Sequence, residues 1–472
     1  MARMGCRGPG LVWRLLETRA GRARRSVTDH YLFASKVPNM DMDIDPSEKP
    51  DPEVTSWLQK LGPGLVTGAA DDDPSGIATY SQAGAQFGFN MLWIVVITYP
   101  LMVAIQIISA SLGRVSGHGL ATNIRRHYPA WLLYGAVALL LIANTINIAA
   151  DLTAMGAAVN LIAGGPTHVY TVALGALSLL LQVFVPYRSY VRVLKWLTLA
   201  LFAYVATVFV VDIPWHTVVV RTFAPHLSWK SDYLTTVVAV LGTTISPYLF
   251  FWQASQEVED MRAEIGQHAL RNAPRQGPAS LRRIRMDTWI GMGFSNLVAF
   301  FIILTTAATL NAHGVTDIQT SAQAAVALKP LAGKFAFTLF SLGIVGTGLL
   351  ALPVLAGSAA YAMAGSFNWR NSLALKPQLA KRFYGIIVLS TLVGLAIGFT
   401  RIDPLKALYW SAVINGVVSV PIMVLIMFMA MNPAIMGRFV IPLHLRVTGW
   451  TATIVMAAAA LAMFWFMAHS VT

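Results

Sequence analysis

The sequence predicts an all-α protein that crosses a membrane with about eleven helices. Hydrophobic residues make up 56% of the 472 residues and charged residues only 12%, about half the charged fraction of an ordinary soluble chain. Apolar runs of about 20 residues, long enough to span a bilayer, recur almost to the C-terminus without a long polar linker. These observations exclude a large water-facing surface and favour one polytopic membrane domain.

The apolar runs divide the chain into three parts. Residues 1–55 are expected to be a cytosolic, disordered tail, residues 56–430 a core of ten helices, and residues 431–472 an additional transmembrane helix. The expected spans lie near 62–84, 91–113, 131–163, 168–185, 193–212, 234–256, 287–311, 335–365, 383–399, 404–430 and 447–468.

The net charge of +13 follows membrane topology and does not indicate nucleic acid. With the N-terminus in the cytoplasm, 27 of the 34 Lys and Arg residues fall in the tail and the inside loops, and six fall in the outside loops. Basic residues near span ends stay on the cytoplasmic side. We therefore expect an integral protein of an inner or plasma membrane, with the lipid bilayer as partner and no nucleic acid.

The first span contains a break that a plain lipid-facing helix would not have. Three carboxylates, Asp71, Asp72 and Asp73, stand directly before Pro74, and Gly76 follows two residues later. Proline removes a backbone donor and clashes with the preceding turn, and it pushes Asp73 out of the helical region. Irregular backbone at membrane depth is tolerated only where it is buried in protein or lines a wet cavity.

The sixth span has a matching break, at Thr243, Ser246 and Pro247. Each break opens a set of five helices, which is the pattern of an inverted-repeat transporter with its site near the bilayer midplane. An ordinary proline kink would explain one break, but two in corresponding positions favour a transporter.

An ionisable group within a span must be paired, hydrated or bound to a cation, because its insertion is costly. Asp73 is the best candidate ligand, with carbonyls freed by the break supplying further oxygens. Asp71 and Asp72 are expected to line the entrance or cap the half-helix, and a wet helix-end cap is an equal alternative.

Further polar residues lie in the third and tenth spans. Asn144, Asn147 and Asp151 are spaced three and four apart, so they stack on one helical face. They form part of the pathway or hold helices together by hydrogen bonds. Asn415 adds an amide oxygen to the site or makes an interhelical hydrogen bond.

The motifs at the two breaks resemble those of the natural resistance-associated macrophage protein (NRAMP) family of divalent metal transporters. The resemblance extends over the spans, roughly residues 56–468. That family carries Asp-Pro-Gly-Asn in its first helix, where this chain has Asp73-Pro74-Ser75-Gly76. Its sixth helix carries Met-Pro-His, where this chain has Ser246-Pro247-Tyr248. The resemblance implies a LeuT-like five-plus-five inverted repeat with discontinuous helices 1 and 6, plus one extra helix. It also implies that a divalent cation is the cargo, with no cofactor.

Two changes from the family pattern point to a different cation. The family's Asn ligand becomes Gly76, which leaves room for water, and its Met becomes Ser246. Carboxylate, carbonyl and water suit magnesium and manganese better than softer metals, and Mg²⁺ keeps several of its waters. The pattern therefore resembles the NRAMP-related magnesium transporter branch.

The groups expected to relay protons have changed as well. The family's two sixth-helix histidines align with Tyr248 and Gln253, and its third-helix Glu aligns with Ala154, three residues after Asp151. Groups that titrate near neutral pH are thus missing from the positions where the family would place its proton relay. Asp151 and the acidic cluster that begins at Glu257 are the remaining proton candidates.

We expect a carrier that moves Mg²⁺ or Mn²⁺ into the cytoplasm by alternating access without obligatory proton coupling. Proton-coupled import of Mn²⁺ or Fe²⁺ is the main alternative, and a sodium-coupled carrier of organic solutes is a second. The remote alternative is an enzyme, a Mg²⁺-dependent prenyltransferase within the membrane. It would require a second Asp-rich motif, for which the sequence offers only the weak match Glu257–Asp260.

Overall fold

Every regular element that the structure describes is a helix. The computed structural model describes residues 67–68, 70–185, 197–400 and 402–469. Within these ranges the predicted all-α class is confirmed. The predicted tail, residues 1–55, lies outside the described residues.

Helices occupy each of the expected spans, with one difference in the count. Nine apolar helical segments of the described chain are long enough to cross a membrane, because two expected spans join as Pro74–Ser116 and Leu199–Val208 is a shorter helix. The helices are α3 (Pro74–Phe87), α4 (Leu92–Ser116), α6 (Ala130–Ala163), α7 (Thr167–Phe184), α9 (Phe202–Val208), α11 (Ser231–Thr244), α12 (Pro247–Ala263), α13 (Gly277–Thr309), α16 (Ala336–Phe367), α17 (Lys381–Gly398), α18 (Pro404–Met431) and α20 (Leu443–His469).

Several short helices in the connecting segments were not predicted from the sequence. A search for apolar runs of about 20 residues passes over them, because each is far shorter than a span. They are α5 (Leu120–His127), α10 (Trp215–Phe223), α14 (Ser321–Val326), α15 (Lys329–Ala332) and α19 (Pro433–Met436).

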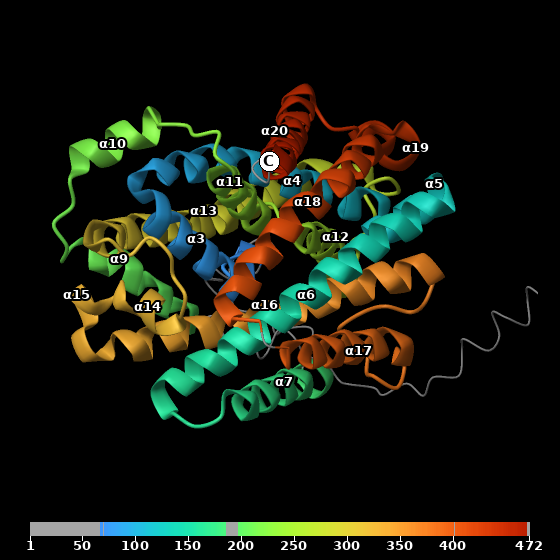
Figure 1. Cartoon of the computed structure of the whole chain (residues 1–472). Helices are drawn as coiled ribbons and strands as arrows, with labels where there is room; N and C mark the ends of the chain where they lie inside the picture. Colours follow the sequence, from blue (N-terminus) through green and yellow to red (C-terminus); the bar gives the residue numbers. More distant parts are fainter. Residues whose placement is uncertain (1–66, 69, 186–196, 401, 470–472) are drawn as a thin grey trace, which may run out of the picture. The chain divides into compact units, whose positions relative to one another are not determined.

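The long helices pack in two groups, with α18 in contact with both. Helices α6, α7, α16 and α17 pack on one another and lie side by side across the lower part of Figure 1. Helices α3, α4, α12 and α13 form the other group, and α18 contacts α3, α11 and α6. The two broken helices thus face α6 and α18. Helix α20 packs against α4, α11 and α18.

Small residues let the helices around the second break approach closely. An ideal Cβ on Gly242 would lie 2.1 Å from the carbonyl oxygen of Ala412 and 2.4 Å from the backbone nitrogen of Gly416. Small residues at interfaces are the usual way in which membrane helices bring their backbones together. The absence of a side chain at Gly242 therefore allows the last turn of α11 to lie directly against the backbone of α18.

We predict that Gly242→Val lowers stability by at least about 1–3 kcal/mol, since the added methyl groups overlap backbone atoms that cannot turn away. Thermal unfolding in detergent measures the change. Gly135→Val on α6 is the matched control, because nothing lies within 4 Å of a Cβ there. Equal melting temperatures for the two variants would contradict the tight α11–α18 contact.

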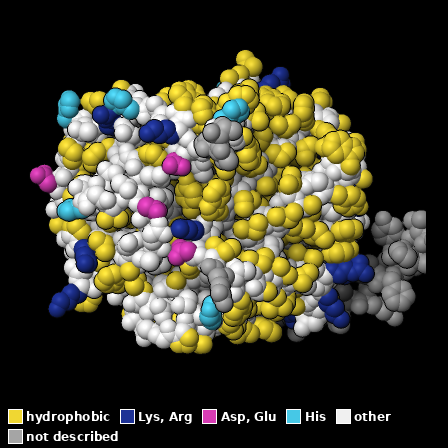
Figure 2. Space-filling view, in the orientation of Figure 1, with side chains coloured by type: hydrophobic (Ala, Val, Ile, Leu, Met, Phe, Trp, Pro, Cys, Tyr) yellow, Lys and Arg dark blue, Asp and Glu magenta, His cyan; other side chains and the backbone are white. Residues whose placement is uncertain are grey.

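Large apolar side chains remain exposed over much of the protein, as a lipid-facing surface requires. Figure 2 shows hydrophobic side chains over a large part of one face. Exposed examples come from several spans and include Trp131, Leu180, Leu389 and Trp465. The chain is an integral membrane protein.

Candidate functional site

The first helix break is built around Asp73. Helical backbone ends at Asp71, and α3 begins again at Pro74. Asp73 has φ −67° and ψ 170°, and it caps the new helix: its Oδ1 accepts the Gly76 backbone N–H at 2.8 Å and the Ser75 hydroxyl at 2.6 Å. Aspartate is a preferred N-cap residue, and proline fits the first helical position. The same residues that break the span therefore also define the break's geometry.

The second carboxylate oxygen of Asp73 joins two other helices. Asp73 Oδ2 accepts the side-chain N–H of Asn147, on α6, at 3.0 Å and the hydroxyl of Tyr248, on α12, at 3.3 Å. Asn147 Oδ1 in turn accepts the Ser411 hydroxyl, from α18, at 2.7 Å. Asp73 is 1% exposed. The four donors that it has among the described residues are all neutral, and none is a cationic side chain.

The second break lies at Ile245 and Ser246, between α11 and α12. The last carbonyls of a helix lack intrahelical partners, and the Ser246 hydroxyl lies 2.8 Å from the oxygen of Gly242 and 2.7 Å from that of Thr243. One hydroxyl proton serves only one of these carbonyls at a time. A carbonyl oxygen and the serine lone pairs therefore stay open to a ligand.

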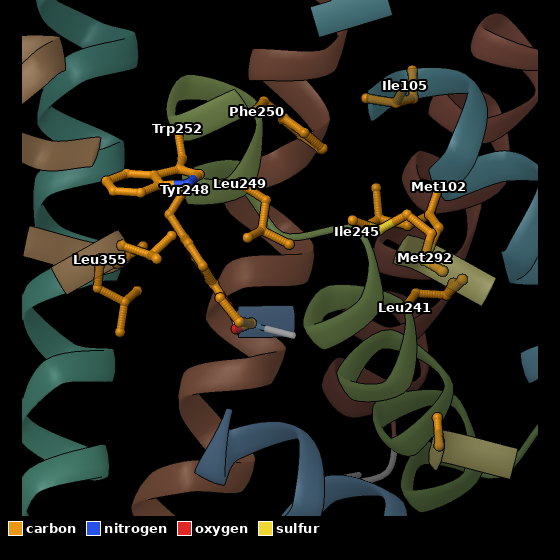
Figure 3. Packing of buried hydrophobic residues seen from close by; sticks show 14 of the residues in the cluster. Met102, Ile105, Leu241, Ile245, Tyr248, Leu249, Phe250, Trp252, Met292 and Leu355 are labelled. Carbon is orange, nitrogen blue, oxygen red and sulfur yellow. The ribbon is translucent and has the colours of Figure 1, made fainter. Parts of the chain in front are cut away.

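Tyr248 and Gln253 connect the two broken helices. Figure 3 shows the Tyr248 side chain extending from α12 past Leu249 toward the ribbon of the first break. Its hydroxyl lies 3.4 Å from the carbonyl oxygen of Ala70 as well as near Asp73. One turn further along α12, Gln253 Oε1 accepts the Thr67 hydroxyl at 2.5 Å. Both predicted pathway residues thus hold the first break in place.

Asp71 and Asp72 face α13. The Ser295 hydroxyl lies 2.5 Å from Asp71 Oδ2 and 3.1 Å from Asp72 Oδ1. Both carboxylates are buried, with exposed fractions of 0% and 5%. Helix α13 packs directly against the first break and buries both carboxylates in this conformation. Their expected role at an entrance or as a helix-end cap stays a prediction.

The space expected beside Gly76 is filled. An ideal Cβ there would lie 3.1 Å from Thr243 Oγ1 and 3.3 Å from the Tyr80 ring. Gly76 therefore allows α3 to approach α11, and the water-sized room expected from its missing side chain is not present in this conformation.

Asp151 and Asn415 are buried polar groups one helical turn from the Asn147–Ser411 hydrogen bond. Both are fully buried. Neither side chain has a hydrogen-bond partner among the described residues. Helices α6 and α18 run in opposite directions (Figure 1), so Asp151 and Asn415 lie about 6 Å to opposite sides of that bond along the helix axes. Unpaired acceptors thus lie above and below the level of Asp73.

Two hollows lie on opposite sides of the buried site. The larger, of about 480 Å³, is lined by Ala78 and Ser81 on α3, by Thr235 on α11 and by Tyr409 on α18. The smaller, of about 40 Å³, is lined by Ser255 and Glu259 on α12. Asp73 lines neither of these two hollows and is buried between them among the described residues.

Packing brings three further residues to the site, Ser295, Ser411 and Met155, which were not predicted from the sequence. Ser295 and Ser411 are serines in long apolar runs, and nothing in their neighbourhood signals a partner across the fold. Met155 had a usable signal, because it lies one turn after Asp151. Met155 and Pro74 both lie against Gly348 on α16. An ideal Cβ built on Gly348 would lie 2.4 Å from Met155 Sδ and 3.2 Å from Pro74 Cγ. A thioether therefore lies near the first break.

Two broken helices that meet at a buried carboxylate, with a hollow on either side, are typical of a secondary transporter. The chain belongs to the Natural resistance-associated macrophage protein-like family, whose sequence profile matches residues 64–466. The resemblance noted at the two breaks is thereby confirmed at the level of the family. The chain is a transporter and not a prenyltransferase.

Individual relatives agree over most of the chain. It is 27% identical over 403 residues to the divalent metal cation transporter MntH of Klebsiella pneumoniae, covering 83% of this chain and 90% of the relative. It is 28% identical over 430 residues to the transporter MntH of Mycobacterium tuberculosis, covering 89% and 92%.

Solved structures share the fold. The manganese transporter of Eremococcus coleocola superimposes with a TM-score of 0.68 at 19% identity, over 86% of each chain. Mhp1, a nucleobase-cation-symport-1 family transporter, superimposes with a TM-score of 0.53 at 14% identity, over 86% and 92%. The fold is the expected LeuT-like one with two discontinuous helices.

Proposed function

We propose that this protein carries a hydrated divalent cation into the cytoplasm by alternating access, with Mg²⁺ preferred and without obligatory proton coupling. Divalent metal transport follows from the family and from the named activity of the relatives. The preference for Mg²⁺ and the absence of coupling rest on the site. A cytoplasmic N-terminus rests on the distribution of basic residues, and the inward direction rests on the membrane potential that acts on a cation.

Asp73 supplies the charge that attracts the cation. Its four neutral donors stabilise the carboxylate as an anion, and none of them is a cation that would compete with the cargo. Two positive charges that move inward through 100 mV gain roughly 4.6 kcal/mol. The membrane potential therefore suffices to drive uptake without a second ion.

The observation that carries the Mg²⁺ proposal is the set of buried, unpaired acceptors around Asp73. Water bound to Mg²⁺ donates both of its protons outward, so a hydrated ion needs acceptors at a distance from the metal. Asp151 and Asn415 offer such oxygens to either side, and the Ser246 region adds a backbone carbonyl. Mg²⁺ sheds its waters reluctantly, so a site rich in outer acceptors favours it.

The positions at which the family carries titratable groups hold neutral ones here. Tyr248 donates to Asp73, and Gln253 accepts from Thr67. Of the acidic cluster on α12, Glu257 pairs with Arg283, and Glu259 accepts from the Tyr361 hydroxyl and the Leu373 backbone N–H. These carboxylates have structural partners, which supports transport without a proton relay through α12.

Proton-coupled uptake of Mn²⁺ is the second candidate, and Met155 favours it. Soft sulfur helps a site to prefer transition metals, and this thioether lies near the first break. Asp151 would then be the proton acceptor. The two candidate functions therefore differ in both properties: the first is Mg²⁺ transport without proton coupling, and the second is Mn²⁺ transport with proton coupling. The sodium-coupled carrier of organic solutes gains no support, because three carboxylates lie at the break.

The test is uptake into proteoliposomes with Mg²⁺, Mn²⁺ and pH indicators inside. We expect Mg²⁺ uptake at a fixed membrane potential without acidification of the lumen. Hexaamminecobalt(III), an inert complex of about the same size as hydrated Mg²⁺, should compete, and Asp151→Asn should weaken that competition. Mn²⁺ uptake with acidification and without Mg²⁺ uptake would overturn the proposal in favour of the proton-coupled importer.

A further inference from the structure

A groove lies on the lipid-facing side of α7 and α17, away from the transport site. It has a volume of about 680 Å³, and its walls include Val183 at the end of α7 and Val388, Leu389 and Leu392 on α17. Helices α7 and α17 are in contact and lie side by side in Figure 1. Leu389 and Leu392 are 57% and 49% exposed. The groove is therefore an open, apolar channel along one helix.

The residues of α17 that form the groove stand in one line. Lys381, Gly385, Leu389 and Leu392 follow one another at intervals of four, four and three residues, so they share one helical face. From Lys381 to Leu392 the helix rises about 16 Å. That length matches much of an extended fatty acyl chain, with the lysine at one end of it.

Gly385 produces the hollow. An ideal Cβ at this position would have no neighbour within 4 Å, so no packing requirement explains a glycine in the middle of an exposed helix face. Glycine lowers helix stability relative to other residues. Its position at the centre of the apolar line leaves space for a ligand against the helix backbone.

The end of the groove at Lys381 is positively charged. Residues 368–382 contain Arg370, Lys376, Lys381 and Arg382, and the sequence has no acidic residue between Asp317 and Asp403. Figure 2 shows Lys and Arg side chains at the right-hand edge, where the loop between α16 and α17 lies in Figure 1.

Among these basic residues, Lys381 is free to contact a ligand in the groove. The Arg382 guanidinium lies over the Trp369 ring, 5.4 Å from its centroid. Tyr384 donates to the carbonyl of Leu375 at 3.0 Å, which holds the basic loop against the start of α17. Lys381 is exposed and lines the groove, and it has no ion pair with any carboxylate that the structure describes.

We propose that the α7–α17 groove binds one anionic glycerophospholipid, with an acyl chain along Gly385, Leu389 and Leu392 and the phosphate at Lys381. Charge selects the ligand, because an apolar groove alone would accept any lipid, whereas a basic pocket between helices at the predicted cytoplasmic surface favours an anionic headgroup. The proposal does not depend on the transported cation.

Native mass spectrometry of the full chain, after exchange into a mixture of phosphatidylglycerol and phosphatidylethanolamine, tests this site. We expect one retained phosphatidylglycerol per chain. Lys381→Gln should lower the ratio of retained phosphatidylglycerol to phosphatidylethanolamine about fivefold, the effect of one surface cation, and Lys381→Arg should preserve it. Gly385→Leu should remove both lipids, because leucine fills the groove without a clash.

Matched controls separate the site from general effects of the substitutions. Gly135→Leu places the same side chain at an exposed glycine of α6 that likewise has no neighbour within 4 Å. Lys334→Gln removes an exposed lysine elsewhere. Both should retain phosphatidylglycerol as the parent does. Equal retention of the two lipids by the parent, or undiminished retention by Gly385→Leu, would overturn the proposal.

Discussion

Replacement of Asp73 by asparagine should abolish cation binding and transport while it leaves the fold intact. Asparagine is isosteric, and it is as good an N-cap as aspartate, so the start of α3 is preserved. What disappears is a buried carboxylate that is hydrogen-bonded to both broken helices and to α6. Removal of one member of a buried, hydrogen-bonded charge interaction costs about 2–5 kcal/mol, which weakens binding by at least about 30-fold.

Isothermal titration with Mg²⁺ and Mn²⁺, followed by uptake into proteoliposomes, measures this loss. Asp212→Asn is the matched control, because it neutralises an exposed carboxylate outside the site. The control should bind and transport as the parent does. Undiminished Mg²⁺ binding by Asp73→Asn would move the charged ligand to another of the buried carboxylates, of which Asp72 and Asp71 are nearest in sequence.

Replacement of Arg283 by methionine should produce the largest loss of stability among the charged residues. Arg283, on α13, lies 2.5 Å from a carboxylate oxygen of Glu257, on α12, and the two side chains are 34% and 0% exposed. Without the arginine, Glu257 stays buried without its cation. Breaking a wholly buried pair costs about 3–5 kcal/mol, and we expect about 2–4 kcal/mol here, because Arg283 is partly exposed and part of the charge is screened.

Thermal unfolding in detergent, read by size-exclusion chromatography, measures this change. Arg282→Met removes a neighbouring exposed arginine and should melt within a few degrees of the parent. The double variant Glu257→Leu, Arg283→Met should recover most of the loss, because it removes the buried carboxylate together with its cation. A single variant as stable as the parent would mean that Glu257 is neutral or reaches water.

The spans and the two helix breaks could be predicted from the sequence because their causes are local. A lipid-facing helix must be apolar for about 20 residues, and Pro74 and Pro247 interrupt the helix wherever the chain is placed. Asp73 was identified for the same reason, since a carboxylate beside such a break at membrane depth needs a ligand or a partner. The motifs at the two breaks also identified the family.

Other features of the site could not be predicted, because they depend on which helices become neighbours. Asp71 and Asp72 turn toward Ser295, which is more than 200 residues away in sequence. Asn147 reaches Asp73 only because α6 and α18 meet at Ser411. The sequence shows which side chains can donate or accept a hydrogen bond, but helix packing determines which of them come into contact.

The protein class, the two breaks and the carboxylate at the first break thus follow from the amino-acid sequence, because backbone sterics and the cost of charge in a bilayer act within a few residues. Packing between distant helices sets three other features: neutral donors from three helices surround Asp73, Gly76 serves helix contact, and Asp151 and Asn415 have no hydrogen-bond partner among the described residues. These features arise where helices far apart in sequence come within hydrogen-bond distance of one another, and no local pattern encodes that distance.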